Sequence, residues 1–435
     1  MMKYKIVTGL ALVVLAGAGT ALYLNGNTRA DEVADDRITA VDAAPADPGA
    51  IARGAYVAVQ GDCAACHTVP GGDAYAGGYA LQTPFGSIYS TNITPALKTG
   101  IGSWTERDFF RAVRHGKGKD GQPLYPAMPY NAYVQMSDDD MHDLWAYIRS
   151  LKPVEQNPRA NTLPFPYNIR LAMLGWNLLF FHNAPYAAKP DQSQQWNRGR
   201  YLVDGAGHCA ACHTAKNLLG GDTSAYLQGA DLLGGHAPEI TGDPYLGLGN
   251  WSNAQVAQYL KRGSNHQAVA SGAMGEAVEH STQHLTDADL AAIAVYLKSL
   301  SGSAMLAPTA LAASDARMNR GALVYETNCM ACHNVKGEGI AGMVTGFADN
   351  PGIRAPGGAN LISTVLHGGR AVVTHENVTG AGMPSFDWKL NDADIAAVLT
   401  YVRNSWGNAA PAIEPGQVAQ ARVALKTQNP VAAGH

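Results

Sequence analysis

The sequence predicts a mainly α-helical fold, with three similar domains in tandem behind an amino-terminal hydrophobic helix. Three observations lead to this fold class. The motif Cys-x-x-Cys-His occurs three times and accounts for all 6 cysteines. A short helix pattern with an Arg-Gly pair precedes each motif, and a capped amphipathic helix pattern follows it. The length of 435 residues fits three domains at roughly 150 residues each.

Composition excludes two broad classes of protein. The chain has 31 Lys and Arg residues against 35 Asp and Glu residues, a net charge of −4, and so no basic surface suited to nucleic acid. Because 46% of its residues are hydrophobic, it can bury cores, which excludes global disorder. We therefore expect a folded protein with no nucleic-acid partner.

The amino-terminal segment, residues 1–30, is a signal for export. Lys3 and Lys5 precede an uncharged run of 19 residues, Ile6–Leu24. This length lies between a signal-peptide core, about 7–15 residues, and a membrane-spanning helix, about 20 residues. Two outcomes stay open: an uncleaved anchor, which the length favours, and a signal peptide cleaved near Ala30. The positive flank sends the following chain, beginning with a linker over residues 31–50, across the membrane in either case.

Each Cys-x-x-Cys-His motif is the attachment signature of a c-type haem. On a helix, residues i, i+3 and i+4 share a face, so two thiols and one imidazole reach the same flat porphyrin. The thiols bond to the haem vinyl groups, and the histidine becomes an axial ligand of the iron. The sequence therefore predicts three haem c groups. Their motifs are Cys63-Ala64-Ala65-Cys66-His67, Cys209-Ala210-Ala211-Cys212-His213 and Cys329-Met330-Ala331-Cys332-His333.

Other uses of these cysteines fit the pattern less well. Six cysteines in an exported protein would usually form three disulfides, but here they occur as Cys-x-x-Cys-His motifs. A zinc site would need further Cys or His ligands at suitable spacing, and a thioredoxin-like motif would occur once beside a βαβ pattern. Three matches that use every cysteine favour haem attachment.

The motifs lie inside longer repeated units. Each unit opens with a helix whose glycine permits close backbone approach. The opening pairs are Arg53-Gly54, Arg198-Gly199 and Arg320-Gly321. Each unit closes with an amphipathic helix that starts after an N-cap residue followed by acidic residues. The N-caps are Ser137, Thr286 and Asn391. We place the domains at 51–155, 195–301 and 316–407, separated by a connector at 156–194 and a linker at 302–315, and followed by a tail at 408–435. We expect little sheet beyond short hairpins, such as one around residues 83–94, and no apolar helix in the tail.

A methionine just before the last helix of each unit is the predicted sixth ligand of each iron, because methionine closes the second axial position in electron-carrying haem domains. The axial pairs would be His67 with Met128, His213 with Met274, and His333 with Met383. Methionine is more often a flexible core residue. Its repeated position on Gly- and Pro-rich loops favours ligation here.

Two pairs of side chains outside these motifs receive structural interpretations. His280 and His284 are spaced i, i+4 with no third ligand nearby, which favours polar contacts over a metal site. Trp104 and Trp251 hold matching positions in the first two units, where we expect them to pack near haem edges or propionates.

The connector contains an apolar stretch, residues 169–181, whose only charge is Arg170. At a rise of 1.5 Å per residue, this stretch would extend about 20 Å as a helix, too short for a hydrocarbon core of about 30 Å. Two interpretations stay open. The stretch packs at a domain junction, or it lies in the membrane interface with Trp176, Phe180 and Phe181 at headgroup depth, beside the entry of a quinone.

Helices that cross through a glycine and an aromatic residue, with a haem between them, resemble the class I cytochrome c fold. More specific stretches resemble the triheme cytochrome c subunit of bacterial membrane-bound alcohol, aldehyde and gluconate-type dehydrogenases. These stretches include Thr83-Pro84-Phe85-Gly86, Tyr125-Pro126-Ala127-Met128-Pro129, Trp176-Asn177-Leu178-Leu179-Phe180 and Gly247-Leu248-Gly249-Asn250-Trp251-Ser252. The resemblance implies that electrons pass from a catalytic partner, which holds pyrroloquinoline quinone, flavin or a molybdenum cofactor, to membrane ubiquinone. It also implies a location on the periplasmic side of the bacterial inner membrane and a partner that oxidises an aldehyde or an alcohol.

Two other functions stay open at this point. A self-contained, peroxidase-like multihaem enzyme would need an iron with an open sixth position, against which the three methionines argue. A free electron shuttle would be a soluble protein that purifies alone. The sequence contains no nucleotide-binding glycine fingerprint and no catalytic dyad, so we predict no catalytic residue and expect substrate oxidation in a partner subunit.

Overall fold

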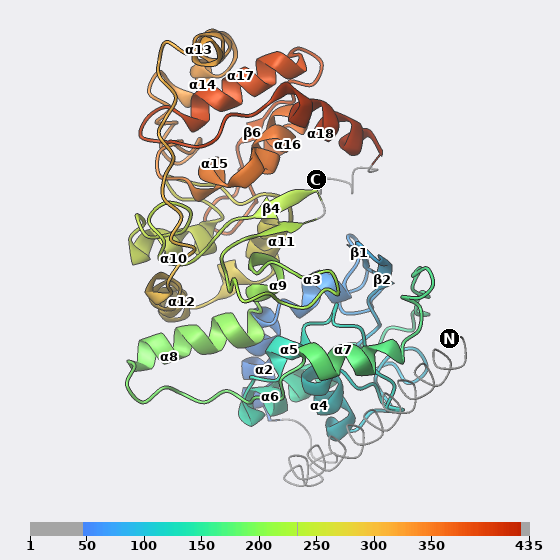
Figure 1. Cartoon of the computed structure of the whole chain (residues 1–435). Coiled ribbons are helices and arrows are strands. Elements are labelled where there is room, and N and C mark those ends of the chain that lie inside the picture. The colour runs from blue at the N-terminus through green and yellow to red at the C-terminus, as the bar shows by residue number, and fades with distance from the viewer. Residues whose placement is uncertain (1–46, 233, 428–435) are drawn as a thin grey trace, which may run out of the picture. The chain divides into compact units, whose positions relative to one another are not determined.

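The structure, a computed structural model, describes residues 47–232 and 234–427. The predicted amino-terminal helix lies outside these residues. In the part of the chain that the structure describes, no helix is long and apolar enough to cross a membrane. The chain forms two compact units, one built mainly from residues up to 186 and the other from residues 187 onward together with 58–66 (Figure 1). Each unit is described by itself.

The described fold is mainly helical, as predicted (Figure 1). The chain up to residue 186 forms α2 (Pro48–Gln60), α3 (Cys63–His67), β1 (Ala80–Thr83), β2 (Gly86–Tyr89), α4 (Glu106–His115), α5 (Tyr130–Tyr133), α6 (Asp138–Ser150) and α7 (Ala172–Phe180). The second repeat forms α8 (Gln194–Tyr201), the π-helical turn η1 (Leu202–Ala206), α9 (Ala210–His213), β3 (Ala230–Leu232), β4 (Gly235–Ala237), α10 (Asn253–Arg262), α11 (Gly272–His280), the 3₁₀ turn η2 (Thr282–His284) and α12 (Asp287–Ser299). The third repeat forms α13 (Ala316–Asn328), α14 (Met330–His333), α15 (Pro351–Arg354), the 3₁₀ turn η3 (Pro356–Gly358), α16 (Ala359–His367), β5 (Gly369–Arg370), β6 (Gly382–Met383), α17 (Asp392–Arg403) and α18 (Pro415–Thr427).

The last helix of each repeat begins at the N-cap that the sequence predicts. The side-chain oxygens of Ser137, Thr286 and Asn391 each accept a hydrogen bond from the backbone N–H three residues later, at 3.1, 3.2 and 2.9 Å. These bonds satisfy donors that have no partner inside the helix. The start of α6, α12 and α17 is therefore set locally by the sequence.

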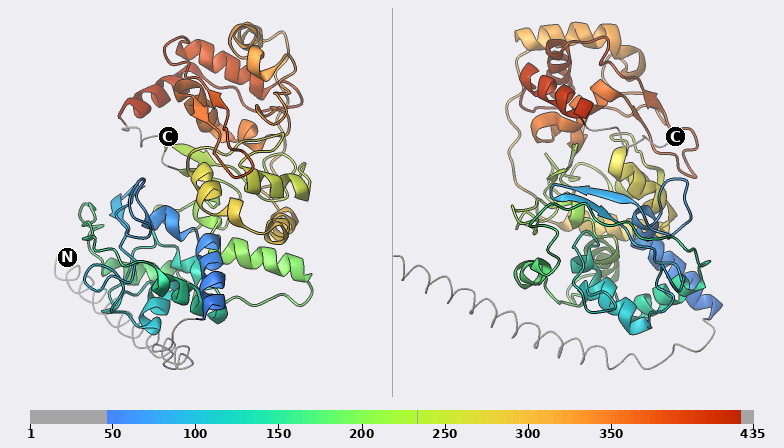
Figure 2. Two further views of the ribbon diagram at one scale, coloured as in Figure 1. Left: turned by 180° about the vertical axis from the view of Figure 1, so that it is seen from behind. Right: turned by 90° about the vertical axis from the view of Figure 1, so that its right-hand side faces the viewer.

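In each repeat, the helix before the haem motif crosses the last helix at a glycine. A Cβ on Gly54, Gly199 or Gly321 would overlap a backbone carbonyl oxygen of the facing helix and approach a tyrosine side chain there. Those tyrosines are Tyr147, Tyr296 and Tyr401. The absence of a side chain therefore lets the two backbones approach closely. The crossing of α13 (orange) with α17 (red) is visible from two further directions in Figure 2.

The arginine beside each of these glycines ties the same two helices together. Arg53 pairs with Asp143 at 2.7 Å, Arg198 with Asp289 at 2.8 Å, and Arg320 with Asp394 at 2.7 Å. In the first two repeats, the guanidinium reaches both carboxylate oxygens. The three repeats thus share one helix-crossing design, which the Arg-Gly pairs encode.

The third repeat has an additional helix in the tail. α18 packs on α17 and α16, and its Val418 is fully buried in the same core as Ile395, Val398 and Ile413. The sequence pattern predicts the tail, residues 408–435, to lie outside the third domain and to contain no apolar helix. Val418 and Ala421 supply most of the apolar contact between this helix and that core. Two apolar residues are too weak a pattern to predict a helix from the sequence.

Sheet is limited to three two-stranded hairpins in the described residues. The first pairs Ala80 with Tyr89 and Thr83 with Gly86, so it begins three residues before the predicted position. The other two pair Ala230 with Ala237, and Gly369 with Met383.

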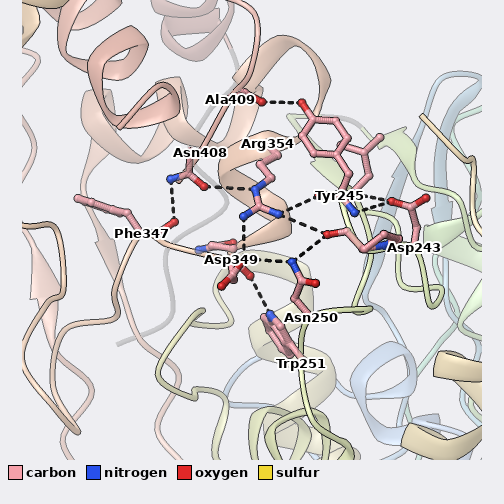
Figure 3. A network of polar contacts seen from close by, with 12 residues as sticks. Asp243, Tyr245, Asn250, Trp251, Phe347, Asp349, Arg354, Asn408 and Ala409 are labelled. Atoms are coloured by element: carbon pink, nitrogen blue, oxygen red, sulfur yellow. Dashed lines mark hydrogen bonds and ion pairs between the residues drawn. The ribbon is translucent and has the colours of Figure 1, made fainter. Parts of the chain in front are cut away.

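Within the second unit, the second and third repeats meet through a buried polar network (Figure 3). Arg354 of α15 donates to Asp349 at 2.9 Å, to Asn408 at 3.2 Å and to the carbonyl of Tyr245 at 3.3 Å. The Trp251 indole N–H donates to the carbonyl of Asp349 at 2.8 Å. Because Tyr245 and Trp251 belong to the second repeat, these contacts join the two repeats.

Candidate haem-binding sites

The three Cys-x-x-Cys-His motifs lie in or beside the very short helices α3, α9 and α14. All six cysteines fall in the described residues, and none forms a disulfide. The burial pattern repeats in every motif. The first cysteine is partly buried and the second is exposed. This identical presentation is what three copies of one attachment site require.

The first thiol of each motif is shielded from solvent. Burial raises the pKa of Cys63 and Cys209 to about 12 and that of Cys329 to about 11. Among the described residues, no group of three or more His, Cys, Asp or Glu side chains is arranged to hold a metal ion. The spacing of the cysteines fits thioether attachment to a haem.

Two of the motif histidines are oriented by a backbone carbonyl. The Nδ1 atom of His67 lies 2.7 Å from the carbonyl oxygen of Thr91, and that of His213 lies 2.7 Å from the carbonyl oxygen of Pro238. Because a carbonyl only accepts, Nδ1 carries the proton and Nε2 keeps its lone pair for an iron. Burial also lowers the pKa of both imidazoles, which favours the neutral, ligating form.

His333 has different surroundings. Its Nδ1 is buried and has no hydrogen-bond partner among the described residues. The ring of Phe347 stacks on the imidazole instead, with 4.5 Å between ring centres and 23° between planes. Burial lowers the pKa of His333 as well, so this imidazole is also neutral. Sequence analysis missed Phe347, which no motif marks.

The three methionines are partly buried and lie on different kinds of backbone. Met128 lies on the turn before α5, as predicted. Met274 lies inside α11, and Met383 lies in the strand β6, so the prediction that these two sit on loops is wrong. Ser271 begins α11 in extended conformation, and the following glycine adopts φ of 55° and continues into the helix. A Gly-rich stretch therefore starts a helix here instead of a loop.

The remaining candidates form packing and polar contacts. Trp251 binds the carbonyl of Asp349 at the junction of Figure 3. His284 makes an edge contact with the His375 ring of the third repeat, with 5.3 Å between centres, and its Nε2 lies 3.1 Å from the Glu279 carbonyl. The contacts of Trp251 with Asp349 and of His284 with His375 join two repeats, and the contact of His284 with Glu279 lies within the second repeat, in line with the structural interpretation of His284.

The apolar connector stretch forms α7, whose two sides differ. Asn177 is buried and accepts a 2.7 Å hydrogen bond from the Tyr130 hydroxyl. The rings of Trp176 and Phe181 pack edge-on against Tyr130, at 6.4 and 5.6 Å, and Phe180 packs on Trp176. The opposite side exposes three leucines, with exposed fractions of 68%, 57% and 59%. They are Leu171, Leu178 and Leu179.

Comparison with known proteins gives a consistent set of relatives. The family model described as cytochrome c matches residues 51–152, 197–301 and 318–406. The chain is 40% identical over 411 residues to the fructose dehydrogenase cytochrome subunit of Gluconobacter japonicus, covering 86% of this chain and 83% of the relative. It is 40% identical over 388 residues to the gluconate 2-dehydrogenase cytochrome c subunit of Pantoea cypripedii, covering 84% and 88%. It is also 38% identical over 385 residues to the cytochrome c subunit of the quinone alcohol dehydrogenase of Gluconacetobacter polyoxogenes, covering 84% and 82%.

Proposed function

The chain belongs to the cytochrome c family, among the cytochrome subunits of bacterial dehydrogenases, and we propose that it passes electrons from its catalytic partner to ubiquinone in the membrane. It is an electron-transfer subunit with three cytochrome c domains and three haem c groups. A haem c supplies one-electron storage by cycling between ferric and ferrous iron. The observation that carries the proposal is the threefold repeat of the Cys-x-x-Cys-His site on one chain, with the histidine oriented by a carbonyl in two of the three copies.

In this proposal the protein residues attach and ligate the haems. Each pair of thiols would hold a haem through two thioether bonds, and each motif histidine would ligate its iron through Nε2. The carbonyls of Thr91 and Pro238 hold two of these imidazoles in the required tautomer. Met128, Met274 and Met383 would each supply a second iron ligand.

Substrate oxidation belongs to the partner subunit. The relatives are named as subunits of dehydrogenases that act on fructose, gluconate and alcohol. We extend this to a partner that oxidises an alcohol or an aldehyde with pyrroloquinoline quinone, flavin or a molybdenum cofactor. The complex lies on the periplasmic face of the inner membrane, held there by the apolar run 6–24 or by surface contact.

The exposed leucines of α7 supply the surface for contact with the bilayer. Leu171, Leu178 and Leu179 are accompanied on the preceding segment by Phe165, which is 78% exposed, and Ile169, which is 44% exposed. Apolar side chains of this size, next to the cation of Arg170, suit the boundary between headgroups and acyl chains. Trp176, Phe180 and Phe181 pack on Tyr130 or on one another, so the membrane-interface interpretation, in which these three rings make the membrane contact, is revised here to the exposed leucines.

The test compares two electron acceptors. We expect the triple variant Leu171→Ser, Leu178→Ser, Leu179→Ser to lose most ubiquinone reductase activity in membranes while the activity of the complex with a soluble dye stays unchanged. Only the lipid-soluble acceptor depends on docking. The control replaces three exposed leucines elsewhere with serine, namely Leu218, Leu219 and Leu306, which are 96%, 61% and 90% exposed. This control should keep both activities.

Two outcomes would contradict the proposal in different ways. Unchanged ubiquinone activity in the α7 triple variant would place the quinone contact elsewhere on the complex. An isolated complex whose haems are not reduced when an alcohol or aldehyde is added would remove the dehydrogenase role itself.

A further inference from the structure

The three motif histidines differ in the hydrogen bond behind the ring. His67 and His213 each bond a carbonyl oxygen at 2.7 Å through Nδ1. The buried Nδ1 of His333 has no such partner among the described residues, and Phe347 stacks on one face of its ring, with 4.5 Å between ring centres.

This hydrogen bond changes how strongly an imidazole donates to iron. An Nδ1–H that donates to a carbonyl makes the ring more basic, which stabilises ferric iron and lowers the reduction potential. We infer that the haem site of the third repeat has the highest reduction potential of the three, because His333 lacks this hydrogen bond. The inference rests on the proposed axial role of the histidines.

The side chains around His333 act in the same direction. Phe347 stacks on His333, and Trp406 stacks on Phe347 with 5.7 Å between centres and 23° between planes. Tyr325 packs on Trp406 at 5.1 Å. A dry aromatic surrounding disfavours the additional charge of ferric iron, which raises the potential further.

Phe347 is also held in place by the junction between the second and third repeats. The Asn408 amide donates to the carbonyl of Phe347 at 3.0 Å, and Arg354 donates to the Asn408 side-chain oxygen at 3.2 Å (Figure 3). Phe347 is therefore a positioning residue, held over one face of the His333 imidazole.

Charges near the attachment cysteines differ between the second and third sites. Burial raises the pKa of both Cys209 and Cys329, but nearby Asp204 adds to the rise at Cys209, whereas Lys389 opposes it at Cys329. A nearby cation stabilises the reduced, less positive iron, and a nearby anion has the opposite effect. At the second site Lys216 lowers the pKa of Cys212 and offsets part of this difference, so the inference depends on hydrogen bonding and apolar surroundings.

The consequence is that the three sites are reduced in a defined order. One electron from the catalytic partner converts ferric to ferrous iron without making or breaking a bond. At equilibrium, the first electron that enters the chain resides at the third site, and the sites of His67 and His213 are reduced afterwards.

The experiment is redox potentiometry of the purified holo-complex, following the haem absorption of the three sites. Met383→His should shift the highest midpoint to lower potential, because methionine ligation raises the potential relative to histidine. The matched variants Met128→His and Met274→His should each shift one of the two lower midpoints. This set assigns each midpoint to a site.

A second set tests the cause. Phe347→Gln offers His333 Nδ1 an acceptor and should lower the highest midpoint potential by about 59 mV or more. For one electron, this shift is a tenfold change in the ratio of ferrous to ferric iron at a given potential. Phe347→Leu, which adds no acceptor, should shift it much less. Lys389→Glu, a surface change that leaves the core intact, should lower the same midpoint and leave the other two unchanged.

Two results would overturn the inference. A shift of the highest midpoint in Met128→His or Met274→His would assign that midpoint to another site. Equal shifts in Phe347→Gln and Phe347→Leu would remove the hydrogen bond as the cause. If Met383→His shifts no midpoint while the Phe347 and Lys389 variants behave as expected, the proposed axial methionine is wrong and the tuning of His333 stands.

Discussion

Met274 lies inside α11, packed beside Ala270, Val278 and Val372, so its role as a ligand is the most informative of the three to test. We predict that Met274→Ala removes one third of the weak charge-transfer absorption that methionine-to-ferric-iron bonds give in the oxidised protein. Methionine is a soft ligand without which the sixth position opens. An absorption spectrum of the oxidised holo-protein measures this.

Met128→Ala and Met383→Ala serve as parallel variants, each expected to remove a further third. Unchanged absorption in Met274→Ala would return this methionine to the role of a core side chain of α11 and leave the second iron with another ligand.

Asp62, directly before the first haem motif, predicts a pH dependence of stability. Burial raises its pKa from 3.8 to about 8, and its Oδ1 is buried without a hydrogen-bond partner among the described residues. Between these values the folded protein retains a proton that the unfolded chain has lost. The free energy of unfolding therefore falls as the pH rises through this window.

The variant Asp62→Asn should remove this contribution, and asparagine tolerates the backbone φ of 51° at this position. We expect the melting temperature to fall less between about pH 5 and about pH 9 in Asp62→Asn than in the unmodified protein. The control is Asp73→Asn, at an exposed aspartate of the same repeat, which should behave like the unmodified protein. Identical pH profiles for Asp62→Asn and Asp73→Asn would contradict the prediction.

At the residue scale, the sequence indicates which groups are expected to bond a haem, but it does not indicate which groups lie behind the imidazoles. The Cys-x-x-Cys-His spacing marks the thiols and imidazoles because attachment needs those side chains on one helical turn. The partners of the imidazoles are the backbone carbonyls of Thr91 and Pro238 in two repeats and the Phe347 ring in the third. Every residue has a backbone carbonyl, so the sequence does not show which carbonyl lies behind an imidazole, and only the fold shows this.

At the element scale, the crossing of α13 with α17 at Gly321 is the contact on which the third repeat depends. A Cβ there would overlap the Ala397 carbonyl and crowd Tyr401. We predict that Gly321→Ala destabilises the third repeat by about 1–3 kcal/mol, because the helices must move apart in a well-packed core. Chemical denaturation of the holo-protein, followed by circular dichroism, measures this loss.

The matched control is Gly416→Ala in α18, where an added Cβ meets nothing within 4 Å. Alanine favours helix relative to glycine, so Gly416→Ala should be neutral or slightly stabilising. A Gly321→Ala variant as stable as the Gly416→Ala variant would show that the crossing tolerates a side chain.

The helices with strong local signals are the ones that the sequence predicts. α6, α12 and α17 combine an N-cap, early acidic residues and apolar residues at helical spacing, and all three begin where predicted. α11 and α18 lack such signals. α11 begins at a glycine with φ of 55°, and α18 is held by tertiary contacts around Val418. Long-range packing stabilises these two helices, and a local sequence pattern does not predict long-range packing.

At the scale of the whole molecule, three copies of one haem domain are joined differently along the chain. The connector at 156–194 carries α7, whose exposed leucines suit a bilayer, whereas the linker at 302–315 contains no helix or strand. The second and third repeats are instead joined by side chains at the junction in Figure 3. A fixed separation between haem domains favours electron transfer, because the rate depends on geometry that thermal motion would otherwise change.

Arg354 is the centre of that junction and gives the last prediction. Its guanidinium is 8% exposed and contacts Asp349, Asn408 and the carbonyl of Tyr245, with its charge 5.9 Å from the centre of the Tyr245 ring. Alanine at this position would leave the buried side-chain oxygen of Asn408 without this donor, at a cost of about 1–3 kcal/mol, and would remove the ion pair with Asp349. We therefore expect calorimetry of Arg354→Ala to resolve separate unfolding of the second and third repeats, where the unmodified protein unfolds them together.

The control is Arg370→Ala, which removes an exposed arginine that bonds only weakly to Gly380 within its own hairpin. This variant should keep the calorimetric profile of the unmodified protein. If Arg354→Ala also keeps it, the two repeats are coupled through the apolar contacts of Val372 with Met274 and Val278, and the polar network only adjusts their alignment.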